Sequence, residues 1–277
     1  MTVETPLKHV RHSYRDGEEA TALSTVDIWL PETNPDGSSP EGIWVVFIHG
    51  GAWRDPLIDS TSFQPTLSIL SQTPPQAQPP IAGYASINYR LSPYPSHPTS
   101  PSTGGDASRA AQHPEHLDDV TTALLFLDEK YGIGGRSRRR RRGGRLPVPL
   151  GMLGSEGIYD IPSLISRNEH PIYREFVVSA FGEREETWSA ASPSMAPGSK
   201  LWEKTGVLIM SHSEEDEYVE KAQSVDMLER IKEVKKDGQA VYVEAEGKHD
   251  EMHEKGGEMA RIIGTGLEMV WVVGWGA

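Results

Sequence analysis

One apolar run that stops at two glycines constrains the fold more than any other stretch. Trp44 to Ile48 carries no charged residue, and it is followed by the string His49-Gly50-Gly51-Ala52-Trp53. A short apolar run bounded by turn residues predicts a strand buried on both faces, as in a parallel sheet covered by helices. The loop after such a strand lies where open α/β sheets bind ligands. Its glycines leave backbone N–H groups free to stabilise negative charge on oxygen, which predicts an oxyanion hole. The alternative is a tight turn after a core strand.

The rest of the chain alternates predicted strands and helices. Residues 3–14 and 25–30 predict edge strands of an antiparallel start. Apolar residues recur every three or four positions in segments that we expect to be helices, namely 60–71, 114–131, 171–181 and 222–234. Further apolar runs predict strands at 81–89, 207–210 and 240–245. This alternation indicates the α/β class, with a mostly parallel central sheet and helices on both faces. A length of 277 residues fits a single domain, 1–277.

Composition narrows the chemistry. The chain has 27 Lys plus Arg against 40 Asp plus Glu, a net charge of −13, which argues against a nucleic-acid or anionic-membrane partner. It has no cysteine, so covalent catalysis would need an oxygen nucleophile. No secretory leader or membrane-spanning segment is visible, so we expect a cytoplasmic protein. His113 and His116 lie beside acidic residues, but nothing else converges on them, so no metal site is expected.

Three motifs taken together carry a family resemblance. They are His49-Gly50-Gly51-Ala52-Trp53, Ile87-Asn88-Tyr89-Arg90-Leu91-Ser92-Pro93 and Gly157-Ile158-Tyr159-Asp160. With them the chain, from about Asp27 to about His253, resembles the kynurenine formamidase (arylformamidase) family of α/β hydrolases. The resemblance implies hydrolysis of N-formyl-L-kynurenine to L-kynurenine and formate in tryptophan degradation, by acylation of a serine and without a cofactor. It implies an oxyanion loop at residues 49–53 and leaves the oligomeric state open, with a homodimer as one option.

Two residues match the family's acid and histidine. Asp216 follows the predicted strand 207–210, and His249 follows the predicted strand 240–245. This order agrees with α/β hydrolases, in which serine, acid and histidine each follow their own strand. The resemblance implies that Asp216 orients the imidazole and that His249 acts as general base and then general acid. The alternatives are a solvated acidic loop around Asp216, and His253 in place of His249.

The stretch before Leu150 departs from the family pattern. A strand, a nucleophile elbow and a long helix should follow the predicted helix 114–131, and together they need about 25 to 35 residues. Only residues 132–149 are present, and the segment 134–149 is an Arg/Gly/Pro-rich sequence that cannot form a central strand. Gly-x-Ser-x-Gly occurs nowhere in the chain. We therefore expect an α/β-hydrolase fold that lacks the central nucleophile strand and the helix after it.

Ser155 is the serine whose surroundings come nearest to the missing nucleophile motif. The string Leu153-Gly154-Ser155-Glu156-Gly157 keeps the serine and the last glycine of the motif. Pro149 and Pro162 lie too close to Ser155 for an elbow that joins a strand to a long helix. Ser155 is therefore a candidate only because it matches part of the sequence motif.

The arginine run has two interpretations. It is a basic loop that docks an acidic partner, or it is sequence that replaced the elbow through altered splicing or a wrong reading of the gene. We favour replacement, because a central strand cannot be dropped without splitting the sheet or forcing its neighbours to pair anew. The chain itself is then expected to be nearly inactive. The other functional hypotheses are a general carboxylesterase with the same loop, and a non-catalytic protein that binds an aromatic metabolite or a protein partner.

Overall fold

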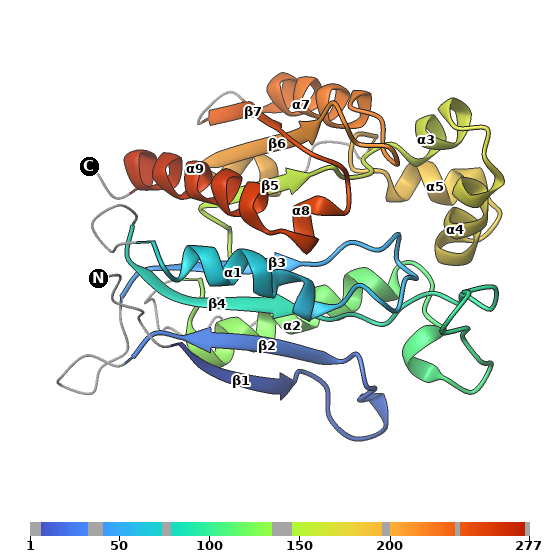
Figure 1. The fold of residues 1–277 in the computed structure, drawn as a ribbon, viewed down its shortest axis with the longest axis horizontal. Helices are drawn as coiled ribbons and strands as arrows, with labels where there is room; N and C mark the ends of the chain where they lie inside the picture. The colour runs from blue at the N-terminus through green and yellow to red at the C-terminus, as the bar shows by residue number, and fades with distance from the viewer. Residues whose placement is uncertain are drawn as a thin grey trace. The chain divides into compact units, whose positions relative to one another are not determined.

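A computed structural model describes residues 7–32, 41–73, 79–134, 146–195, 200–235 and 239–274. They form two compact units, and Figure 1 labels most of their helices and strands. The first unit takes in 1–63, 80–147 and 175–182, and the second takes in 64–79, 148–174 and 183–277. Each unit has its own sheet, where the sequence predicts one central sheet. That the two units make up a single domain stays a prediction.

The first unit has a four-stranded sheet in the order β1-β2-β4-β3 (Figure 1). The pairs β1–β2 and β2–β4 are antiparallel, and β3–β4 is parallel. The predicted antiparallel start is therefore confirmed, although residues 3–6 lie outside the described part of the chain. The prediction that 25–30 is an edge strand is wrong, because β2 pairs with β1 on one side and with β4 on the other. The strands are β1 (Lys8–Ser13), β2 (Thr25–Leu30), β3 (Ile43–Ile48) and β4 (Ile81–Ile87).

The sequence predicts β3 to be buried on both faces, but the strand lies at an edge. It pairs with β4 on one side, and no described strand pairs with its other side. The residues between Ile43 and Ile48 are half-buried, and Ile48 is 46% exposed. An edge strand presents unpaired backbone N–H and C=O groups. The predicted burial fails because it assumes a second neighbouring strand.

The helix α2 (Glu115–Tyr131) covers one face of this sheet. Its Ala123 and Leu127 are fully buried against Val26, Ile28 and Ile87 of the strands. These positions lie four apart on the helix, as the amphipathic pattern of 114–131 predicts. The same unit contains the short 3-10 helices η1 (Gly17–Glu19), η2 (Ser60–Phe63) and η3 (Ala107–Arg109).

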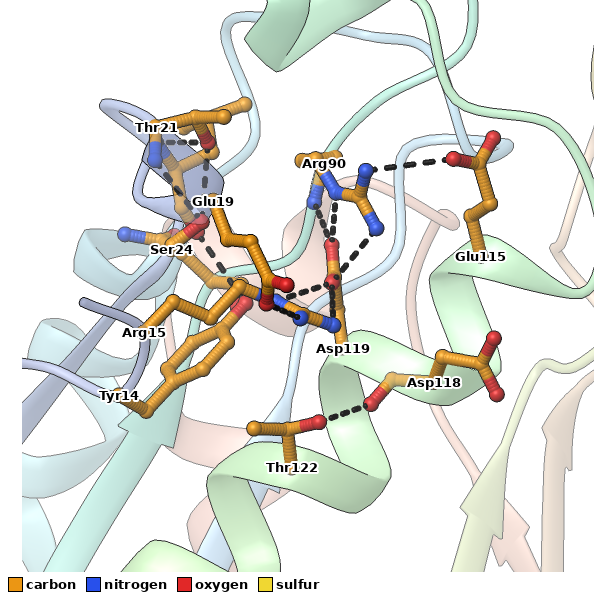
Figure 2. A network of polar contacts seen from close by, with 12 residues as sticks. Tyr14, Arg15, Glu19, Thr21, Ser24, Arg90, Glu115, Asp118, Asp119 and Thr122 are labelled. Carbon is orange, nitrogen blue, oxygen red and sulfur yellow. Dashed lines mark hydrogen bonds and ion pairs between the residues drawn. The ribbon is translucent and has the colours of Figure 1, made fainter. Parts of the chain in front are cut away.

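A buried carboxylate ties α2 to the ends of two strands. Figure 2 shows Asp119 of α2 between Arg15, which follows β1, and Arg90, which follows β4. Arg15 donates to Oδ1 at 3.0 and 2.8 Å, and Arg90 donates to Oδ2 from its backbone at 2.9 Å and from Nε at 2.8 Å. Burial alone would raise the pKa of Asp119, but the hydrogen bonds from Arg90 and Arg15 outweigh it and hold the pKa below its usual value. The two arginines therefore keep Asp119 ionised at neutral pH.

The second unit has a parallel three-stranded sheet in the order β5-β6-β7 (Figure 1). Its strands are β5 (Gly151–Ser155), β6 (Val207–Ser213) and β7 (Gln239–Ala245), and every residue of β6 is buried. Leu208 and Met210 of β6 pack against the helix α7 (Ala222–Val234). The side chain of Ile209 lies beside Gly266 of α9 (Gly257–Gly274). Alternate residues of β6 thus face different helices, so the predicted cover of both faces is confirmed for this sheet.

The remaining helices match the prediction in part. The predicted helix 60–71 is present as η2 followed by α1 (Gln64–Leu70), and the predicted helix 171–181 is α4 (Pro171–Phe181). Several helices were outside the prediction, namely α3 (Ile161–Arg167), α5 (Glu185–Ala191), α6 (Lys200–Lys204), α8 (Glu251–Glu254) and α9. Of the segment 134–149, residues 135–145 lie outside the described residues, and 146–149 have no regular structure. Across the described ranges, none of the helices combines the length and the apolar character that a membrane crossing needs.

Candidate active site

The structure brings two of the predicted residues, Asp216 and His249, into direct contact in the second unit. β6 and β7 are parallel neighbours, so the loops at their carboxyl ends emerge at the same edge of the sheet. Asp216 lies in the loop after β6, and His249 lies in the loop after β7. The Nδ1 atom of His249 lies 2.9 Å from Oδ2 of Asp216. An ionised carboxylate can only accept, so Nδ1 carries the proton and Nε2 of the neutral ring is a proton acceptor.

Asp216 is a fully buried carboxylate enclosed by donors. The backbone N–H groups of Tyr218 and Val219 donate to its Oδ1 at 2.8 and 2.9 Å. Its Oδ2 also lies 3.1 Å from Nε2 of His212, and its side chain has no exposed surface. Burial alone would raise the pKa of Asp216, but hydrogen bonds from His212 and His249 outweigh it, so the pKa is held well below the usual value. Asp216 is therefore an anion throughout the neutral range.

His212 is a second histidine on Asp216 and is not among the residues predicted from the sequence. It is fully buried at the end of β6, and its Nε2 also lies 2.7 Å from the carbonyl oxygen of Val219. Its Nδ1 lies 2.9 Å from Oγ of Ser224. A carbonyl can only accept, so Nε2 of His212 carries a proton. His212 thus fixes the loop that carries Asp216, and its four-residue spacing from Asp216 was the available signal.

One ring nitrogen of His249, Nδ1, is hydrogen-bonded to Asp216, while the rest of the ring is partly exposed. Its side chain is 28% exposed, and the ring of Tyr218 meets it edge-on with centroids 5.5 Å apart. Burial alone would lower the pKa of His249, but the hydrogen bond and charge of Asp216, followed by the charges of Glu156 and Asp250, raise the pKa above its usual value. The arrangement is that of an imidazole oriented by an acid for proton transfer.

Glu156 is a third group in this cluster. It directly follows β5, its side chain is 4% exposed, and its Oε2 lies 3.6 Å from Nδ1 of His249. Burial raises the pKa of Glu156 to about 7, and repulsion from Asp216 adds to that effect. The sequence around Glu156 does not distinguish it, because nothing in the local pattern shows that β5 and the loop after β7 meet.

The same three residues have the composition of a metal site. Their potential ligand atoms in Glu156, Asp216 and His249 all lie within 4.8 Å of one another. Two ligands of a tetrahedral zinc ion, each at about 2.1 Å, would lie about 3.4 Å apart. The separation of His249 Nδ1 and Asp216 Oδ2 is 2.9 Å, which is a hydrogen-bond distance. The observed geometry therefore fits a hydrogen-bonded acid–histidine pair better than an ion-binding set.

Ser155, the weak nucleophile candidate, is the last residue of β5. It pairs with Ser211 of β6, and its Oγ is buried without a hydrogen-bond partner among the described residues. The next helix, α3, begins only at Ile161 and is short. A nucleophile elbow places its serine on a sharp turn directly between a strand and a helix. Ser155 has the position of an ordinary strand residue. Its nucleophilic role therefore stays a prediction based only on the match to the sequence motif.

The predicted oxyanion loop lies in the first unit, at the end of β3. Gly51 has φ +90°, and Ala52 and Trp53 have φ 47° and 60°, in the left-handed region that side chains rarely adopt. Within the described chain, the backbone N–H groups of Gly51 and Ala52 have no hydrogen-bond acceptor. Backbone N–H groups of this kind are what an oxyanion requires. The role of residues 49–53 in catalysis stays a prediction.

Tyr89 and His49 hold the start of this loop. The hydroxyl of Tyr89 donates to the carbonyl oxygens of His49 and Gly50, each at 3.1 Å, and its ring stacks on His49 with centroids 4.4 Å apart. Burial lowers the pKa of His49 to about 4, so its imidazole is neutral at physiological pH. The backbone N–H of Ser92 donates to the carbonyl of Trp53 at 2.8 Å. The motif around Tyr89 and Ser92 therefore supports the loop.

The histidines at the start of α2 have local roles. His116 is buried, and its Nε2 lies 2.9 Å from Oγ of Ser92, which is fully buried. His113 packs its ring against Phe181 with centroids 5.3 Å apart. Burial lowers the pKa of His116 to about 4. The Ser92–His116 pair is thus a neutral, buried hydrogen bond without access for a substrate.

Comparison with curated proteins identifies the family. The chain is 32% identical to the kynurenine formamidase-like hydrolase fscH of Fusarium equiseti, over 90% of this chain and 91% of that protein. It is 33% identical to the kynurenine formamidase avaC of Aspergillus versicolor, over 76% of this chain and 83% of that protein. The chain belongs to this kynurenine formamidase-like family. No protein-family model matches it.

Solved structures with low identity show the fold of this family member. A brefeldin A esterase, described as a bacterial homologue of human hormone-sensitive lipase, superposes with a TM-score of 0.62 at 13% identity, covering 98% of this chain and 79% of that one. A truncated carbohydrate esterase from gut microbiota gives a TM-score of 0.60 at 14% identity, covering 96% and 98%. The chain therefore has an α/β-hydrolase-like fold.

The alignment with the Fusarium relative also shows that this family member is shorter in places. It runs over 276 positions, yet it takes in only 90% of the 277 residues of this chain. Roughly a tenth of the aligned positions therefore have no residue of this chain opposite them. The relative therefore carries residues that this chain lacks.

Proposed function

We propose that the protein is built to hydrolyse N-formyl-L-kynurenine to L-kynurenine and formate. The observation that carries the proposal is the 2.9 Å contact of Asp216 with His249, at the ends of adjacent parallel strands, in a chain with kynurenine formamidase-like relatives. The small aryl formamide is the substrate, and the proposal needs no cofactor. The cytoplasmic location and the option of a homodimer stand as further predictions.

The residues have distinct roles in this reaction. A serine Oγ attacks the formyl carbon while Nε2 of His249 takes its proton, and Asp216 stabilises the resulting imidazolium. Backbone N–H groups of residues 49–53 stabilise the oxyanion. His249 then returns the proton to the departing amine of kynurenine, and water hydrolyses the formyl-serine to formate by the reverse sequence of proton transfers.

The serine is the part that this chain does not offer. Ser155 lacks an elbow, and no Gly-x-Ser-x-Gly is present. Enzymes of this type without their triad serine keep about 10³ to 10⁴ over the uncatalysed rate, from the oxyanion hole and substrate binding. We therefore expect the chain to be nearly inactive, and we expect its gene to encode the missing elbow near the codons for residues 134–150. Sequencing the transcript and the genomic DNA there tests that expectation.

A serine-directed fluorophosphonate probe tests the assignment of the nucleophile. We expect no labelling above that of a Ser155→Ala variant. Labelling that Ser155→Ala abolishes would make Ser155 the nucleophile and overturn the proposed loss. An aryl formamide and a short ester, assayed side by side, separate a formamidase from a general carboxylesterase.

The absence of an elbow motif from the sequence favours one further candidate, a protein that binds an aromatic metabolite without catalysis. Calorimetry with L-kynurenine and N-formyl-L-kynurenine tests it. Binding without turnover, in the chain as it stands and in a chain with the elbow restored, would favour this candidate over the enzyme.

A further inference from the structure

Glu156 occupies an unusual place beside the acid–histidine pair. Its φ is +50°, a conformation that costs a residue with a side chain about 1 kcal/mol or more and persists only when the surroundings enforce it. Its backbone N–H donates to the carbonyl of Ser211 at 2.9 Å, which fixes it to β6. Its side chain is nearly fully buried, and its Oε1 has no hydrogen-bond partner among the described residues. A buried carboxyl oxygen without a partner is costly, so this placement calls for an explanation.

The surroundings of Glu156 supply the explanation. Its Oε2 lies 3.6 Å from Nδ1 of His249, the same nitrogen that donates to Asp216. The groups that favour its ionised form are His249, His212 and the backbone N–H of Ser213, and Asp216 opposes it. Two carboxyl groups this close to one imidazole both ionise readily only while the imidazole is positively charged.

We propose that Glu156 is a second carboxyl partner of His249, which holds a proton when the imidazole is neutral and releases it when the imidazole is charged. It is a positioning residue of the acid–histidine pair, so its catalytic meaning rests on the proposed function. When Glu156 is protonated, Asp216 is the one ionised carboxylate among the described residues that contacts Nδ1 of His249. When Glu156 is ionised, it adds a second negative charge beside that nitrogen and stabilises the imidazolium. The coupling itself is measurable in this chain whether or not it hydrolyses anything.

Other titratable groups face the same cluster and set the background for the measurement. They are Asp216, His212, Glu217, Tyr218, Asp250 and Tyr159. Of these, Asp216 stays ionised at neutral pH, because its pKa is held well below the usual value. Burial and the charge of Asp216 raise the pKa of Glu156 to about 7, and Asp216 raises the pKa of His249 above its usual value. Two groups in such close contact titrate as a coupled pair.

The test is an NMR titration of the His249 ring in the full chain. In Glu156→Gln we expect the proton affinity of His249 to fall about tenfold, because an opposite charge within about 4 Å has been removed. Glu215→Gln is the matched control, since Glu215 is exposed in the Asp216 loop and loses the same charge. It should leave the proton affinity within about twofold of the starting chain. An unchanged His249 titration in folded Glu156→Gln would overturn the proposal.

A second measurement follows Glu156 itself in the unaltered chain, so it does not depend on the Glu156→Gln variant. The side-chain carboxyl carbon of Glu156 in the unaltered chain, assigned with Glu156→Asp, should titrate in the same pH interval as the ring carbons of His249. A single Glu156 transition near pH 4 would refute the shared proton. Failure of the hydrolysis assays would leave both NMR results unaffected, so the two proposals fail separately.

Discussion

Replacing Asp119 by Asn tests the polar network that joins α2 to the strand ends of the first unit. Asp119 has no exposed side-chain surface, whereas Arg15 and Arg90 are 16% and 20% exposed (Figure 2). Removing one partner of a buried ion pair costs about 3 to 5 kcal/mol. The arginines can regain some hydration, so we expect the lower end, about 3 kcal/mol, in the free energy of unfolding.

Thermal unfolding followed by circular dichroism measures this effect. A loss of about 3 kcal/mol should lower Tm by roughly 6 to 12 °C in a chain of this size. Asp118→Asn is the matched control, because Asp118 is an exposed neighbour on the same helix, and its effect should stay within about 0.5 kcal/mol. Equal losses in the two variants would refute the reasoning.

The pH dependence of Asp119→Asn has a definite sign. The pKa of Asp119 is lower in the folded chain than its usual value, so its contribution is present above about pH 4 and is lost as the pH falls below that. The stability difference between the starting chain and Asp119→Asn should therefore shrink in acid. A difference that persists unchanged below pH 3 would contradict the assigned ionisation.

Three further substitutions test local features. Gly51→Ala should destabilise the first unit by about 1 to 3 kcal/mol in urea unfolding, because φ of Gly51 is +90° and an added Cβ would lie 3.1 Å from Ile58. Gly50→Ala is the control, because Gly50 has open space around it, and it should cost less than about 1 kcal/mol. Tyr89→Phe should cost about 1 to 2 kcal/mol by the same measurement, since it removes the donor to the carbonyls of His49 and Gly50; no loss would show that the loop holds itself. Ile48→Lys should reduce light scattering on storage, because it places a charge at the edge of β3. Ile69→Lys, an exposed position in α1, is the control and should not reduce it. Equal effects would mean that the net charge of the chain, not the edge of β3, controls association.

Much of the arrangement was predictable because strong local patterns survive in this chain. Asp216 and His249 could be predicted because each follows a run of apolar residues that forms a strand, and adjacent parallel strands place their following loops together. The helix α2 followed from apolar spacing, which packing against the sheet satisfies.

The failures have physical causes as well. The edge position of β3 could not be predicted from its apolar run, because such a run is the same whether its second neighbour is present or missing. The role of Glu156 depends on which side chains meet between the end of β5 and the loop after β7, and no local period encodes that. The helix α9 contains several glycines, and its packing on the sheet outweighs their low helix propensity.

The most direct test compares turnover of N-formyl-L-kynurenine by this chain and by a chain in which residues 132–149 are replaced by the corresponding segment of the Fusarium relative. The unaltered chain should be no more than about tenfold faster than its own His249→Gln variant, since the triad works only as a unit. The restored chain should be at least about 10³ times faster than the unaltered chain, and His249→Gln should abolish that gain. Efficient turnover by the unaltered chain, or no gain in a folded restored chain, would contradict the claim that an intact acid–histidine pair has lost its serine.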